Sequence, residues 1–181
     1  MEIDIAAFQA ECADYLGSWG VSAVIEIVIH GASLIDTAIG HRIRAEIIGG
    51  STANALLRPT GLLGDYSGKL QVLYCFKFIN KDTFQDCQSI SELRNIFAHQ
   101  RSVRNLDGSD QRAKVRSLNI LSAISSKASG LSALIIDELL PIQQFALASC
   151  LLAMDIASAA AESAFDASVN CEILRRLGST A

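Results

Sequence analysis

Apolar residues recur along this chain at the three- and four-residue steps of an α-helix. A first amphipathic helix is predicted over residues 3–16, where the apolar positions are Ile5, Phe8, Cys12, Tyr15 and Leu16. The longest predicted helix covers 21–48, with apolar positions Val24, Val28, Ile35, Ile39, Ile43 and Ile47. Because residues 21–29 are apolar on almost every face, we expect this helix to be central in the fold. Glu26 interrupts the apolar run, which is too short to span a bilayer.

The same pattern predicts the rest of the chain. Further helices are expected at 62–79, 83–99, 111–125, 141–165 and 166–177. The positions expected to face inward are Tyr66, Leu70, Leu73 and Phe76 or Lys77 in the first of these, Phe84, Cys87, Ile90, Leu93 or Arg94, and Phe97 in the second, and Val115, Leu118, Leu121 and Ile124 in the third. Flexible connections are expected at 49–61, 101–110 and 125–130, where Gly, Pro, Ser and Asp gather. Asn80 or Asp82 is a suitable N-cap for the helix after it, and Pro141 suits a first helical turn.

Composition supports an all-α fold. Half of the 181 residues are apolar, only two are proline, and strand alternation is nowhere sustained. We therefore expect one domain over residues 1–181, a compact helical bundle of about six to eight helices. The helix after Pro141 is apolar nearly all round, which favours burial in a core or subunit interface over a membrane. We expect a homodimer formed through such helices.

The cysteines and the N-terminus indicate the cytoplasm. The five cysteines are widely spaced and include no C-x-x-C pair, as expected of free, buried thiols and not of a disulfide framework or zinc site: Cys12, Cys75, Cys87, Cys150 and Cys171. No basic region precedes an apolar stretch at the N-terminus, so we expect no secretory signal. No cofactor or metal is predicted.

One segment is basic although the chain has a net charge of −4. Between residues 94 and 116 two acids, Asp107 and Asp110, stand against six basic residues: Arg94, Arg101, Arg104, Arg112, Lys114 and Arg116. The last five of these are candidate residues for binding nucleic acid or another anion. The alternative is that they are solvated charges on a loop and a helix face.

The segment 92–99 contains the best candidates for catalytic or phosphate-binding side chains. On a helix, Asn95 and His99 share one face, and the long side chain of Arg94 can reach across to them. A cation, an amide and an imidazole together can hold a phosphate and move a proton beside it. In a purely structural role, Arg94 would pair with an acid such as Glu46, Asp36 or Glu92, and His99 would cap its helix.

The other isolated polar residues are weaker candidates for a functional site. His30 is expected inside the fold and His41 on its surface. Glu26 and Asp155 are expected to bond neighbouring helices.

Residues 94–99, Arg-Asn-Ile-Phe-Ala-His, resemble the R-x4-H signature of the higher eukaryotes and prokaryotes nucleotide-binding (HEPN) superfamily of helical domains. Many members are metal-independent ribonucleases that act as dimers. The resemblance implies that His99 is the base toward a ribose 2′-hydroxyl. Arg94 would stabilise charge on the scissile phosphate, and Asn95 would orient one of the reacting groups.

A second resemblance covers residues 21–160. The pair Ile35-Asp36, the stretch 61–70, the block 94–99 and the late helix with Pro141 and Phe145 resemble the mannitol operon repressor family of all-helical regulators. The match differs from the family pattern in 49–60 and after His99, as in a divergent member. No short helix pair joined by a tight turn presents a basic recognition face, so we expect no direct sequence-specific DNA binding.

Two functions therefore remain open. The first is a non-enzymatic regulatory protein acting through a protein partner or a small anionic ligand. The second is a metal-independent endoribonuclease or nucleotide-binding domain that uses Arg94, Asn95 and His99 at a dimer groove. RNA is a possible partner in the second case.

Overall fold

The computed structural model describes residues 5–17, 23–46, 50–100, 105–127, 136 and 138–158. Within these ranges there are eight helices and no strand, which confirms the predicted all-α bundle. The helices are α1 (Ile5–Gly17), α2 (Val24–Glu46), α3 (Ser51–Leu56), α4 (Tyr66–Cys75), α5 (Lys81–His99), α6 (Ser109–Arg116), α7 (Asn119–Lys127) and α9 (Pro141–Ser158). The helix predicted at 166–177 and the extension of α9 to 165 lie outside the described residues.

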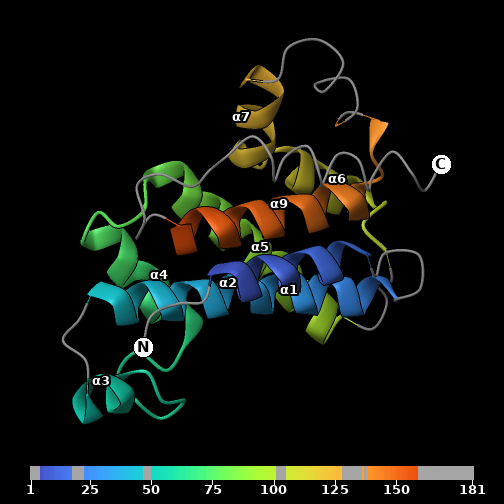
Figure 1. Ribbon diagram of the computed structural model, residues 1–181. Helices are drawn as coiled ribbons and strands as arrows, with labels where there is room; N and C mark the ends of the chain where they lie inside the picture. Colours follow the sequence, from blue (N-terminus) through green and yellow to red (C-terminus); the bar gives the residue numbers. More distant parts are fainter. Residues whose placement is uncertain are drawn as a thin grey trace.

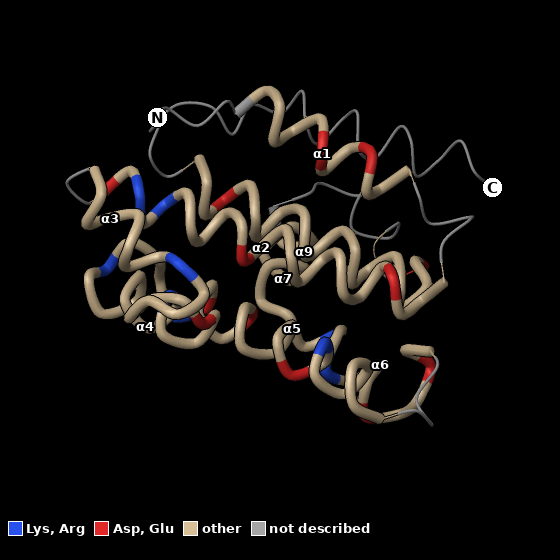
Figure 2. Tube along the Cα trace, turned by 90° about the horizontal axis from the view of Figure 1, so that it is seen from below, with Lys and Arg blue, Asp and Glu red and all other residues tan. Residues whose placement is uncertain are grey.

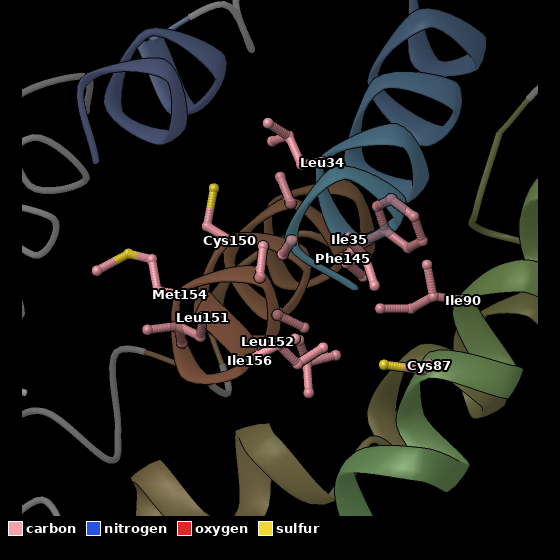
Figure 3. Packing of buried hydrophobic residues seen from close by; sticks show 14 of the residues in the cluster. Leu34, Ile35, Cys87, Ile90, Phe145, Cys150, Leu151, Leu152, Met154 and Ile156 are labelled. Atoms are coloured by element: carbon pink, nitrogen blue, oxygen red, sulfur yellow. The ribbon is translucent and has the colours of Figure 1, made fainter. Parts of the chain in front are cut away.

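Helices α2 and α9 form the centre of the bundle and run side by side, with α1 and α5 packed on them (Figure 1). Of the 18 residues of α9, 14 are buried, so its apolar composition is explained by packing within one chain. Figure 3 shows its side chains directed toward Leu34 and Ile35 of α2 and toward Cys87 and Ile90 of α5. The predicted homodimer would therefore need a surface other than the described part of α9.

Helices α1, α2 and α9 meet at Gly31. A Cβ atom at this position would lie 2.6 Å from the Tyr15 hydroxyl, 2.9 Å from Ser149 Oγ and 3.0 Å from the Phe145 ring. The Tyr15 hydroxyl donates a hydrogen bond to the Ile27 carbonyl, 2.8 Å away, and is thus held over the glycine. Gly31 does not interrupt α2, because here it permits the close packing of three helices.

By length and composition alone, α2 could also cross a membrane. In the bundle, its buried positions include Ile27, Val28, Leu34, Ile35 and Ile39. The 18-residue window that passes this test is 44% buried inside the bundle, so a core role accounts for many of its apolar residues.

The connection predicted over 49–61 contains a short helix, α3, that the sequence pattern did not indicate. The chain after α3 folds back onto it, and the Leu63 N–H donates to the Leu56 carbonyl at 2.9 Å. A Cβ at Gly61 would lie 2.2 Å from the Ala55 carbonyl oxygen. This glycine therefore allows the backbone to pack against α3.

Helix α4 is shorter than the helix predicted over 62–79. It begins after Asp65, whose carboxylate accepts a hydrogen bond from the Gly68 N–H at 2.8 Å. Leu70 and Leu73 are buried as expected. Phe76, one of two residues predicted to extend this buried stripe, lies beyond the helix end and is 68% exposed.

The end of α4 is a Schellman motif without its usual glycine. The Phe78 N–H donates to the Leu73 carbonyl at 2.9 Å, and the Lys77 N–H donates to the Tyr74 carbonyl at 3.0 Å. Lys77 takes the left-handed conformation, with φ of 61°. Because glycine normally marks this position, no local stop signal is present, and the helical period predicted a helix that continues past the true end.

Replacing Lys77 with glycine should stabilise the protein. Glycine adopts the left-handed conformation without the steric cost of a Cβ. This gain is only partly offset by the larger conformational entropy that glycine gives to the unfolded chain. We expect the free energy of unfolding to rise by about 0.5–1 kcal/mol in urea titrations. Lys77→Ala keeps the Cβ and removes the charge, so it should bring no such gain. An equal gain in both variants would assign the effect to the charge.

Helix α5 matches its predicted range closely. Asn80 caps it, since its side-chain oxygen accepts from the Thr83 N–H at 2.9 Å. Of the positions predicted to face inward, Phe84 is only partly buried, and Arg94, the alternative to Leu93, is exposed. The others are buried: Cys87, Ile90, Leu93 and Phe97. The predicted helix over 111–125, by contrast, is two helices, α6 and α7.

Asp86 of α5 explains this break. Its carboxylate is buried and accepts hydrogen bonds from the backbone N–H groups of Asn119 and Ile120, each at 2.8 Å, and from the Asn119 side chain at 2.9 Å. These bonds satisfy donors at the first turn of α7. Burial raises the pKa of Asp86, while these hydrogen bonds oppose the rise. Because the cap comes from a distant part of the chain, no local pattern predicts where α7 begins.

Removing this cap should destabilise the bundle. In Asp86→Ala, two N–H groups of α7 lose their acceptor, and we expect a loss of about 1–3 kcal/mol in the free energy of unfolding. Asp82→Ala is the matched control, because Asp82 is exposed in the first turn of the same helix. Its loss should stay below about 1 kcal/mol, the usual size of a helix-dipole contribution. Equal losses would argue against a capping role.

Candidate functional site

The three candidate catalytic residues lie together at the C-terminal end of α5. The helix buries its apolar face, so Arg94, Asn95 and His99 fall on the solvent side and all three are exposed. Nη1 of Arg94 donates a hydrogen bond to the Asn95 side-chain oxygen at 2.9 Å. His99 is the last residue of the helix. The structure thus brings the arginine and the amide into contact and leaves the imidazole open to solvent.

Arg94 is not paired with any of the acids proposed for a purely structural role. Asp36 pairs with Lys69, Glu46 with Arg42, and Glu92 with Lys114. Among the described residues, Arg94 has no ion pair and the side chain of His99 has no hydrogen bond. The backbone acceptor at this helix end, the Ile96 carbonyl, receives the Gln100 N–H at 2.8 Å. The three side chains are therefore available to a ligand.

The basic segment is partly neutralised by acids. Helix α6 lies beside α5, and Lys114 forms an ion pair with Glu92 across the two helices. Arg112 faces Asp107, with 3.7 Å between the charged groups. Figure 2 shows basic and acidic positions close together where α5 and α6 meet. Arg101 and Arg104 lie outside the described residues.

Arg116 is placed differently from the other cations. It has no ion pair within the described part of the chain, and it lines a pocket of about 600 Å³. The walls come from α7 and α9, and the lining includes Leu121, Ser122, Ser125 and Gln144. Periodicity indicated that Leu121 would be buried, but it gave no sign of a pocket.

The isolated histidines and Glu26 differ from the sequence-based expectations. His30 is exposed and lies edge-on against Tyr15, with ring centroids 5.0 Å apart. His41 is half-buried against Phe8, and burial lowers its pKa. Glu26 is exposed and accepts from the Ala23 N–H at 3.3 Å, so it supports the start of its own helix.

Three of the four described cysteines are free thiols in the core. Cys12, Cys87 and Cys150 are free and buried as expected, whereas Cys75 is exposed; Cys171 lies outside the described residues. Burial raises the pKa of the Cys87 thiol to about 12 and also raises that of Cys150. In the described ranges no cluster of three His, Cys, Asp or Glu side chains could hold a metal ion.

Comparison with known proteins gives one informative likeness. No family model matches the chain, and no curated protein sequence matches it significantly. The fold is similar to that of the mannitol operon repressor MtlR in the X-ray structure of the MtlR–HPr complex from Escherichia coli. The TM-score is 0.65 at 19% sequence identity, and the match covers 83% of this chain and 99% of that one. At this identity the likeness establishes a shared fold.

Helices α6 and α7 form a short pair joined by a tight turn, which the sequence had not suggested. A helix-turn-helix reads DNA with its second helix. In α7 the only charged residue is Lys127, at the last position, while the remaining positions are apolar, serine or asparagine. The pair therefore lacks a basic recognition face.

Proposed function

We propose that this chain is a non-enzymatic regulatory protein that acts through a protein partner or a small anionic ligand, as a divergent relative of the mannitol operon repressor family. The observation that carries this proposal is the similarity to almost the whole of MtlR, a protein whose structure was determined in complex with HPr. The absence of a basic face on α7 favours regulation by contact over DNA reading. We place the protein in the cytoplasm and expect it to form a homodimer.

The end of α4 supports a role in protein contact. Phe76 is 68% exposed and stacks on Phe78, with ring centroids 6.1 Å apart. Tyr74 beside it is 38% exposed. Lys77 projects from this turn in a backbone conformation that lysine rarely takes, and strained conformations tend to occur at functional sites. Aromatic residues, Phe and Tyr among them, are enriched at protein interfaces relative to the rest of the surface.

The direct test is binding of purified HPr from Escherichia coli by isothermal titration calorimetry. We expect association in the micromolar range, and a Phe76→Ser variant should bind at least about tenfold more weakly. Leu62→Ser is the matched control, because Leu62 is 81% exposed on a different loop and its loss should leave binding unchanged. Absence of any binding by the wild type would count against this partner class. Equal binding by all three proteins would place the contact elsewhere.

The second candidate function is metal-independent RNA cleavage. The exposed positions of Arg94, Asn95 and His99 on one helix end favour it, as does the contact between the first two side chains. In this mechanism His99 would accept the proton of a ribose 2′-hydroxyl. Arg94, oriented by Asn95, would stabilise the negative charge on the phosphate. Two copies of the motif would meet in a dimer groove.

The two functions predict opposite results with RNA. Wild-type protein is incubated with mixed structured RNA in the presence of EDTA, and a regulatory protein should leave it intact. If the ribonuclease function holds, His99→Ala should lower the cleavage rate about 10²–10⁴-fold. His30→Ala is the control, because His30 is also exposed but lies on α2. Cleavage that persists in His99→Ala would identify a contaminating nuclease.

A further inference from the structure

The pocket beside α7 has the size of a small-molecule site. Its volume of about 600 Å³ lies within the range of roughly 300–1,000 Å³ found for ligand pockets. Leu121 and Ile136 are buried and supply its apolar part. Ser122, Ser125 and Ser126 of α7 and Gln144 of α9 supply the neutral polar groups.

Arg116 provides the charge of the pocket. The other described cations of α6 face acids, since Arg112 lies near Asp107 and Lys114 is paired with Glu92. Arg116 is exposed, and no described acid forms an ion pair with it. An anionic group entering the pocket would therefore meet a guanidinium that is free to form two parallel hydrogen bonds.

Gln144 provides the second indication of a ligand. Only 3% of its surface is exposed, and its amide nitrogen donates to the Ile136 carbonyl at 2.9 Å. Its side-chain oxygen is buried and has no hydrogen-bond partner among the described residues. Buried polar atoms are nearly always hydrogen-bonded, and an acceptor of this kind requires a donor. A hydroxyl group of a molecule bound in the pocket would meet this requirement.

The serines extend the same polar surface. The Ser126 hydroxyl donates to the Ala123 carbonyl at 2.9 Å, which leaves its oxygen to accept from a ligand. The side-chain hydroxyls of Ser122 and Ser125 have no hydrogen bond within the described part of the molecule, so each can donate or accept. The pocket thus combines one cation, several hydroxyls and one unmatched acceptor over an apolar floor.

We propose that this pocket binds a small organic anion that also carries hydroxyl groups, either a hydroxylated phosphate monoester or a hydroxycarboxylate. The anionic group binds Arg116, and the hydroxyls bind the serines and Gln144. The ligand's part in regulation rests on the function proposed above. Its binding does not, because the pocket is defined by its own residues.

Thermal unfolding with two probes tests the proposal and separates the two anion classes. Glycerol 3-phosphate represents the phosphate monoesters and malate the hydroxycarboxylates, with potassium chloride at matched ionic strength as the reference. We expect one probe or both to raise Tm by about 3–6 °C at a concentration roughly tenfold above Kd. Calorimetric titration of the same probe supplies the Kd.

Two arginine variants on the same helix show whether the pocket is responsible. Arg116→Gln should abolish the rise in Tm, whereas Arg112→Gln should retain it, because Arg112 is also exposed but does not line the pocket. Ser122→Ala should weaken binding several-fold without affecting the fold, since Ser122 is exposed. A rise no greater than with potassium chloride, or equal rises in both arginine variants, would overturn the proposal.

Binding of HPr by the same variants keeps the two proposals apart. Arg116→Gln should bind HPr as the wild type does in the absence of the anion. If the wild type binds HPr but neither anion, the pocket proposal alone is refuted. If the wild type binds the anion but not HPr, the proposed partner is refuted and the pocket proposal is unaffected.

Discussion

The close packing of α1, α2 and α9 around Gly31 is the constraint on which the rest of the fold depends. Tyr15, Phe145 and Ser149 fill the space that a side chain at this position would occupy. With α9 enclosed on most sides, its described apolar residues are used within the chain. Polar chemistry is therefore confined to the periphery of the bundle, along the exposed side of α5 and on the shorter helices.

Asp86 determines how that periphery is arranged. By capping α7 from the buried face of α5, it fixes the point at which α6 ends and α7 turns away. Lys114 of α6 is then beside Glu92 of α5, and Arg116 is at the edge of the pocket formed with α7 and α9. One buried carboxylate thus positions both the cations that become paired and the cation that stays free.

Much of the fold could be predicted from hydrophobic spacing because most helices have one buried face. Phe8, Cys12 and Tyr15 of α1 and Cys87, Ile90 and Leu93 of α5 were all expected to be buried, and they are. The missed helix boundaries depend on interactions that hydrophobic spacing alone does not encode. Asp86 caps a distant helix, Lys77 occupies a glycine position, and Gly61 allows the chain to pack back against α3.

The candidate site shows the same division between local and long-range information. The exposure of Arg94, Asn95 and His99 follows from their positions opposite the buried face of α5, so the sequence was sufficient to place them together. Whether each cation in the basic segment is free to bind an anion could not be predicted, because this depends on which acid the fold places beside it. Glu92 and Asp107 reduce the charge available from Lys114 and Arg112. A surface neutralised in this way is poorly suited to binding a long polyanion such as RNA. A single free guanidinium beside hydroxyl groups is sufficient to bind a small organic anion.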